Sequence, residues 1–107
     1  MSKSQPEFVT FLHAELEGIA DLMARRFFGG WQLRAGNAQF AIVMNGTLFF
    51  RVEGELRKIL EEDGSRPFSY AESGKQVSVP KYMSAPEGAL DDLDLLRAWV
   101  QRVIAAT

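Results

Sequence analysis

The sequence contains no cysteine and a single histidine, His13. Without cysteine the chain cannot form a disulfide, a cysteine-based zinc site or a thiol nucleophile. His13 has no second histidine with which to hold a metal, and we interpret it as a structural residue of a helix. Neither a Gly-x-Ser-x-Gly elbow nor a glycine-rich phosphate loop is present. We therefore predict no bound metal, no organic cofactor and no enzymatic activity.

Long apolar runs are also missing. The longest, residues 40–44 and 48–50, are far below the roughly 20 residues that span a bilayer. The first seven residues lack the apolar stretch of a signal peptide. These features predict a cytoplasmic domain that does not enter a membrane.

What is present is an ordinary globular composition. The chain has 107 residues, of which 47% are hydrophobic and 24% charged, which is typical of one domain spanning residues 1–107. The formal net charge is -2. Residues 25–58 are mainly basic, whereas residues 7–21 and 87–102 are mainly acidic. The basic middle indicates either a surface for a polyanion or, as we favour, balance between solvated faces.

Helical periodicity appears near both ends of the chain. Ser4-Gln5-Pro6-Glu7 has the chemistry of a helix start, and a helix is predicted from there to about Ile19. The same pattern recurs at Ser84-Ala85-Pro86-Glu87 and predicts the start of a last helix, most clearly over residues 92–105. The apolar stripes of the two helices are Phe8, Phe11, Leu12, Leu16 and Ile19, and Leu93, Leu96, Val100 and Val103.

The middle of the chain alternates as strands do. The predicted elements are three strands over residues 22–33, 38–44 and 47–52, a helix over 54–63, and two strands over 67–71 and 76–79. Gly29-Gly30 interrupts the first strand, and Asn45-Gly46 is a strong hairpin signal. Pro80 is expected to end the last strand, because proline cannot donate to the ladder. The order αβββαββα predicts an α+β fold in two layers, an antiparallel sheet packed by helices.

A basic and aromatic motif, Arg25-Arg26-Phe27-Phe28-Gly29-Gly30-Trp31, stands out in the first strand. Neighbouring strand residues face opposite sides. We therefore expect one arginine to lie on or beside the helix-covered face, paired with a carboxylate of Glu15, Glu17 or Asp21. The other arginine is expected to face solvent beside the glycines and Trp31. Arginines mixed with aromatics also leave open an alternative, the binding of single-stranded nucleic acid.

This motif resembles the Arg-Arg-Met-Phe-Gly-Gly-Tyr signature of the TfoX (Sxy) N-terminal domain family. The resemblance extends in register from about residue 7 to residue 105. Further matching segments are Phe40-Ala41-Ile42, Leu48-Phe49-Phe50-Arg51-Val52, Pro67-Phe68-Ser69-Tyr70, and Val77-Ser78 followed by Tyr82 and Pro86. Phe27 and Trp31 depart from the signature, as does the Phe49-Phe50 pair.

The resemblance implies a stand-alone domain with a two-layer α-β(3)-α-β(2)-α fold similar to secretion chaperones. It also implies a role in regulating natural competence, in which full-length members act with the cyclic-AMP receptor protein at promoters. We therefore expect a non-enzymatic regulatory or protein-interaction module, a transcriptional co-regulator. Its partner would be a protein of the transcription machinery or a second copy of the chain. The alternatives are a nucleic-acid-binding domain and an enzyme with an unrecognised site. The candidate interaction surface comprises Arg25, Arg26, Phe28, Gly29, Gly30, Trp31, Lys81 and Tyr82.

Overall fold

The structure, a computed structural model, describes residues 5–19 and 21–107. Within these ranges the chain forms three helices and six strands, so the α+β prediction is confirmed. Ser4, the first residue of the predicted helix-start motif, lies outside the described residues. The elements are α1 (Gln5–Glu15), β1 (Leu22–Phe27), β2 (Gly30–Ala35), β3 (Ala38–Met44), β4 (Thr47–Arg51), α2 (Gly54–Glu62), β5 (Pro67–Glu72), β6 (Lys75–Ser84) and α3 (Leu93–Ala106).

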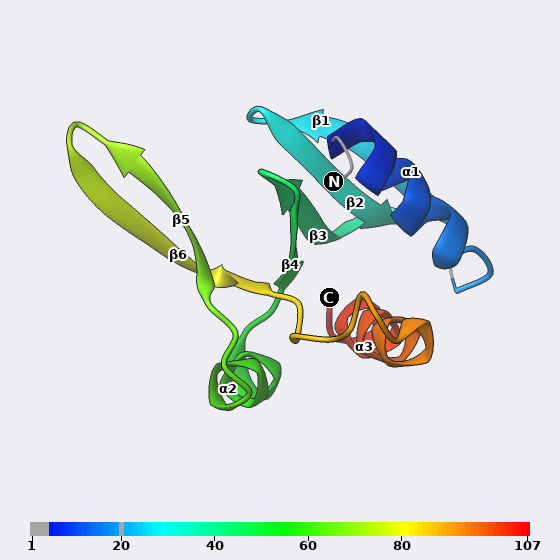
Figure 1. Cartoon of the computed structure of the whole chain (residues 1–107). Coiled ribbons are helices and arrows are strands. Elements are labelled where there is room, and N and C mark those ends of the chain that lie inside the picture. The colour runs from blue at the N-terminus through cyan, green and yellow to red at the C-terminus, as the bar shows by residue number, and fades with distance from the viewer. Residues whose placement is uncertain (1–4, 20) are drawn as a thin grey trace.

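The six strands form one antiparallel sheet in the order β1-β2-β3-β4-β6-β5. The described helices lie on one side of this curved sheet (Figure 1), and they share one apolar core with it. Cross-strand partners point to the same side. We call the other side the helix-free face. On it, residues paired across neighbouring strands form a row that crosses five strands. This row consists of Arg25, Gln32, Ile42, Phe49 and Ser84.

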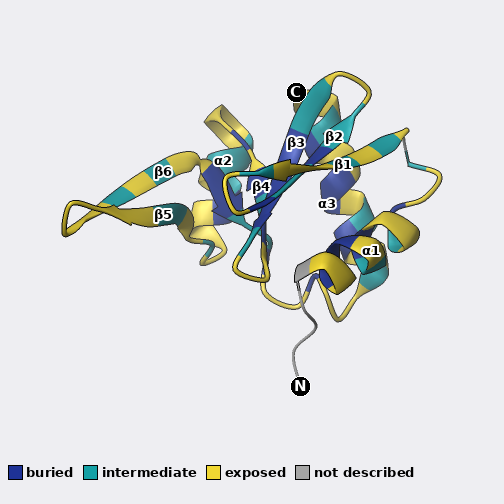
Figure 2. Ribbon diagram, turned by 90° about the horizontal axis from the view of Figure 1, so that it is seen from above, coloured by how far each residue is buried: buried dark blue, intermediate teal, exposed yellow. Residues whose placement is uncertain are grey.

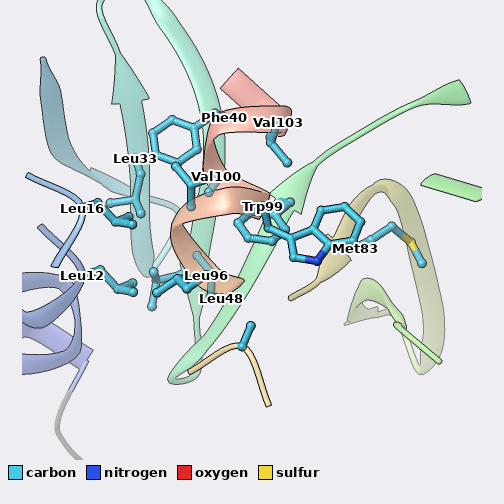
Figure 3. Close-up of a cluster of buried hydrophobic side chains, with 14 of the residues drawn as sticks. Leu12, Leu16, Leu33, Phe40, Leu48, Met83, Leu96, Trp99, Val100 and Val103 are labelled. Atoms are coloured by element: carbon cyan, nitrogen blue, oxygen red, sulfur yellow. The ribbon is translucent and has the colours of Figure 1, made fainter. Parts of the chain in front are cut away.

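The core between sheet and helices follows the predicted stripes. Leu12 of α1, Leu16 just after that helix and Leu96 of α3 are buried, and they converge on the sheet from two sides (Figure 3). Phe50 of β4 stacks on Trp99 of α3 with ring centroids 6.4 Å apart. Leu60 of α2 is fully buried in the same core.

The first predicted strand is two strands, which is one more than the sequence suggested. Phe28 and Gly29 have φ of +46° and +83°, as both central residues of a two-residue type I′ turn require. Phe27 then pairs with Gly30 and the chain reverses. The sequence pattern predicted an interruption at Gly29-Gly30, whereas the turn residues are Phe28 and Gly29. The turn was missed because Phe is rare at a positive φ. The element order is therefore α-β(4)-α-β(2)-α.

The first helix ends at Glu15, earlier than the predicted Ile19. Gly18 takes a φ of +90°, the left-handed conformation that typically ends a helix. Arg97 of α3 donates from Nη1 to the carbonyl oxygens of Glu15 at 2.6 Å and Glu17 at 3.3 Å. These bonds satisfy carbonyls that the helix end leaves free.

Two predictions for the end of the chain were wrong. Pro80 does not end β6, because it lies where the pairing with β5 shifts register between Pro67 and Phe68. A proline is tolerated at such a bulge, where the ladder needs no donor. Ser84 does not begin a helix, since its hydroxyl accepts from the amide of Arg66 at 2.9 Å. The last helix instead begins at Leu93.

Candidate interaction surface

The β1–β2 turn holds a large apolar side chain out of the fold. Phe28 is 87% exposed, and its ring contacts that of Phe27 edge to face at 4.8 Å. Gly30, just after the turn, is buried, and a Cβ at that position would lie 2.3 Å from the carbonyl oxygen of Val43. The glycine therefore lets β2 lie close to β3, and this contact fixes the position of the turn.

Phe28 lies at the edge of an apolar hollow of about 540 Å³. The hollow lies on the helix-free face, between the β1–β2 turn, the end of β3 and the strands of the β5–β6 hairpin. Its lining residues are Phe27, Phe28, Met44, Phe68, Tyr70, Val79 and Tyr82. In Figure 1 the β1–β2 and β5–β6 hairpins rise on either side of the β3–β4 turn, which makes this face concave.

A second, shallower depression continues the same surface. Arg66, Phe49 and Ser69 line it together with Met44 and Phe68, which also belong to the hollow. The rings of Phe49 and Phe68 pack edge to face with centroids 5.4 Å apart. Aromatic side chains from β4 and β5, far apart in the sequence, thus form one continuous apolar surface.

The family of the chain follows from a comparison of its sequence with known protein families. The family model described as the TfoX N-terminal domain matches residues 14–107, which include every described strand and the last two helices. The chain belongs to the TfoX N-terminal domain family. The family resemblance of the sequence is thereby confirmed. A search of curated proteins finds no match to the chain.

The motif that resembles the TfoX signature is split between the two faces of the sheet. Arg25 pairs with Gln32 on the helix-free face, whereas Arg26 pairs with Trp31 on the face covered by α1. Trp31 is partly buried against the core. The structure therefore confirms that the two arginines lie on opposite faces, but the indole of Trp31 belongs with Arg26 and not with the solvent-facing arginine.

The predicted carboxylate partner of the inner arginine was wrong. Both Arg25 and Arg26 are exposed, so neither guanidinium needs a buried counter-charge. The guanidinium of Arg26 instead lies over the Trp31 ring, 5.1 Å from its centroid. This is the geometry of a cation–π contact.

The remaining predicted residues lie on or near the hollow. Tyr82 lines it, is buried, and donates its hydroxyl to Oε1 of Gln39 at 2.9 Å. Lys81 places its ammonium 5.4 Å from the centre of the Tyr82 ring. Phe28 and Tyr82 thus line one hollow and Lys81 contacts Tyr82, with Arg25 on the same face. That these residues contact a partner stays a prediction.

Sequence reasoning missed five of the hollow's lining residues, namely Phe27, Met44, Phe68, Tyr70 and Val79. A signal was present in the strand 67–72, where Phe68 and Tyr70 alternate with small or polar residues. Such alternation predicts one apolar face, but it does not reveal which element covers that face. In the part of the chain that the structure describes, none of the three helices covers it (Figure 2).

Neither a cluster of metal-ligand side chains nor an ion pair is found at this surface among the described residues. Among the described residues, no three histidine or carboxylate side chains gather where they would hold a metal ion. The ion pair of the described ranges joins Arg57 and Glu61 on α2, at 3.4 Å. No helix in the described ranges has the length and hydropathy to cross a bilayer.

Proposed function

We propose that this TfoX N-terminal domain is a non-enzymatic interaction module of the cytoplasm, which holds a protein partner in the apolar hollow of its helix-free face. One observation carries the proposal. Phe28 stands 87% exposed at the edge of the hollow in a backbone conformation that costs a non-glycine residue about 1–2 kcal/mol. In keeping with its family, we propose that the module serves as a transcriptional co-regulator.

The other hairpins of the chain provide an internal comparison. Asn45 and Ser73 occupy the same position in the β3–β4 and β5–β6 turns, with φ of +52° and +51°. Both are small and polar, and asparagine in particular tolerates a left-handed backbone. Phe28 is the aromatic exception among the positive-φ residues of the described ranges. Folding gains little from an exposed ring at this position, whereas binding gains an anchor.

The chemistry of the hollow favours binding over catalysis. Tyr70 and Tyr82 supply its only side-chain oxygens, and the Tyr82 hydroxyl is already engaged with Gln39. The remaining lining residues are Phe, Met or Val. Aromatic and methionine side chains are enriched in the cores of protein interfaces, and aromatic rings bury large areas at low entropic cost.

Site-specific photocrosslinking in the native host tests the proposal. A photoreactive phenylalanine analogue replaces Phe28 in one variant and Ala98, which is exposed on α3, in a control. We expect a protein crosslinked from position 28 and not from position 98. With that protein purified, Phe28→Asn should weaken binding by about tenfold or more, as loss of an aromatic anchor does.

Asparagine suits the turn, so Phe28→Asn should fold normally, which circular dichroism will confirm. If crosslinks form equally from both positions, or if Phe28→Asn binds the purified partner as tightly as the native chain, the hollow is not the docking surface.

A further inference from the structure

The two layers of the molecule carry opposite charge. The six strands contain six basic side chains and one acidic side chain, Glu72. The helices and their flanking turns hold the other acidic residues, with groups such as Glu61, Glu62 and Asp63 at the end of α2. The sheet layer is therefore basic although the chain as a whole has a net charge of -2.

Three cations of the strands, and Arg66 just before β5, lie on or near the helix-free face. Two of them, Arg51 and Lys81, also line a separate depression together with Glu53. Arg25 lies two residues before Phe27 on β1, and so points to the same face. Arg66 lines the adjoining depression, Lys81 lies against the Tyr82 ring, and Arg51 pairs across β4 and β6 with Tyr82. All four residues are exposed.

These four cations have no carboxylate partner within the described ranges, where the ion pair found is that of Arg57 with Glu61 on α2. An apolar hollow with unpaired cations elsewhere on the same face is complementary to apolar side chains flanked by carboxylates. Resting on the function proposed above, we infer that the partner presents an acidic amphipathic segment to this face. Its apolar residues enter the hollow, and its Asp and Glu side chains contact the surrounding arginines and lysine.

The charges are expected to act mainly on recognition. Exposed ion pairs add little affinity each, but complementary charge speeds encounter and excludes like-charged competitors. Apolar burial in the hollow supplies the affinity, and the cations select acidic segments among the many amphipathic ones. Binding should therefore weaken as salt screens the charges.

A protein segment suits this surface better than single-stranded nucleic acid. Bases stack on open ring faces, whereas the Phe27–Phe28 and Phe49–Phe68 pairs meet at interplanar angles of 81° and 72°. In each pair one ring edge is turned against the face of the other ring. Met44 and Val79 add aliphatic surface to the hollow, which packs against apolar side chains.

Fluorescence polarisation with labelled probes tests the inference. The first probe is a short synthetic peptide that alternates glutamate with leucine and phenylalanine. The second has lysine in place of every glutamate, and the third is an oligothymidine. We expect the glutamate peptide to bind about tenfold or more tightly than the lysine peptide, a difference of ~1.4 kcal/mol. Its affinity should fall as salt is raised.

Matched charge reversals locate the effect. Arg25→Glu combined with Arg66→Glu should abolish the preference for the glutamate peptide. Lys58→Glu combined with Arg102→Glu changes the net charge equally, but on exposed positions of α2 and α3, and should leave the preference intact. Thermal melts of both double variants establish that they are folded.

The outcomes separate this inference from the proposed function. If both peptides bind equally well and Phe28→Asn weakens both, the docking surface stands and the inference about acidic partners is overturned. If neither peptide binds, or only oligothymidine binds with loss in the Arg25/Arg66 variant, the inference is overturned. Binding of oligothymidine alone would also overturn the proposed protein partner.

Discussion

Gly30 shows how one residue type is required by a neighbour distant in sequence. A Cβ atom added to Gly30 would lie only 2.3 Å from the carbonyl oxygen of Val43 and 2.2 Å from the sulfur of Met44. The methionine side chain can move, but the carbonyl belongs to the central part of the sheet. The neighbouring Gly29 has open space around its Cβ position and needs glycine only for its φ of +83°.

We predict that Gly30→Ala destabilises the fold by about 2–3 kcal/mol, because the added methyl group must displace β3 from β2. Gly29→Ala, the matched control, should cost about 1 kcal/mol, the usual penalty of a left-handed alanine. Urea denaturation measures both free energies of unfolding. A Gly30→Ala variant no less stable than Gly29→Ala would show that β2 does not lie this close to β3.

Arg25 and Arg26 differ in their faces and not in their burial. Arg26→Ala removes an exposed cation–π contact with Trp31 and should lower stability by about 0.5–1 kcal/mol. The Arg25 side chain is exposed and makes no ion pair or cation–π contact within the described residues. Arg25→Ala should therefore change stability by less than about 0.5 kcal/mol. Thermal melts of the two variants compare them directly. A loss of several kcal/mol for Arg26→Ala would point to the carboxylate pair that the structure lacks.

At the scale of elements, α1 and α3 are joined by a side chain that closes a helix end. Nη1 of Arg97 bonds two carbonyls at the end of α1, and the side chain is partly buried. Since hydrogen bonds to charged groups are stronger than neutral ones, Arg97→Ala should cost about 1–2 kcal/mol. It should also speed hydrogen exchange across residues 5–15.

Arg102→Ala is the control for this prediction, because Arg102 is exposed on the same helix and its guanidinium lies over the Trp99 ring, 4.5 Å from the centroid. It should leave exchange in α1 unchanged. Equal exchange in α1 for the two variants would mean that Arg97 does not anchor the first helix.

The last helix offers a second matched pair in adjacent leucines. Leu96 is fully buried, whereas Leu95 is 39% exposed. Leu96→Ala should cost about 2–5 kcal/mol, since it leaves a cavity in the core, and Leu95→Ala should cost less than about 1 kcal/mol. Urea denaturation of both variants is the measurement. Near-equal losses would mean that α3 is rotated from the orientation described.

The whole molecule combines one core with a hairpin that extends beyond it. Buried side chains of all three helices and of β2, β3, β4 and β6 form one cluster, which predicts cooperative unfolding. The outer part of the β5–β6 hairpin projects away from this cluster (Figure 1), and residues 70–76 are exposed. The outer part of the hairpin is thus held mainly by the pairing of its own two strands.

Native-state hydrogen exchange should therefore divide the sheet in two. Amides of β3 are expected to exchange only through global unfolding, and those of residues 70–76 through local opening at much lower free energy. Urea titration of the exchange rates distinguishes the two routes. If the hairpin amides are protected as strongly as those of β3, something beyond the described contacts stabilises them.

Much of the fold could be predicted because its signals are local. Leu12 belongs to the apolar stripe predicted for the first helix, and Leu96 and Val100 to that of the last helix. All three are buried, as the stripes predicted. Asn45-Gly46 forms the expected turn, because the backbone preferences of these two residues do not depend on distant residues. Asp92, whose side chain accepts from the amide of Leu95 at 3.2 Å, caps α3 at the position where the clearest periodicity began.

Other features of the fold depend on contacts between residues far apart in the sequence, which a local sequence pattern does not reveal. The turn at Phe28 forms against the preference of its residue, because pairing of β1 with β2 and the close packing of Gly30 on β3 outweigh the local cost. Pro80 stays within a strand because the register of β5 shifts beside it.

The candidate site belongs to this second group. Phe68 and Tyr70 read as ordinary half-buried strand residues, and only the placement of the helices on the opposite face leaves them open. The sequence by itself determined most of the helices and strands, the Asn45-Gly46 turn and the family. Tertiary packing decided which face stays uncovered and which aromatics and cations gather on it, because that depends on long-range contacts between the sheet and all three helices.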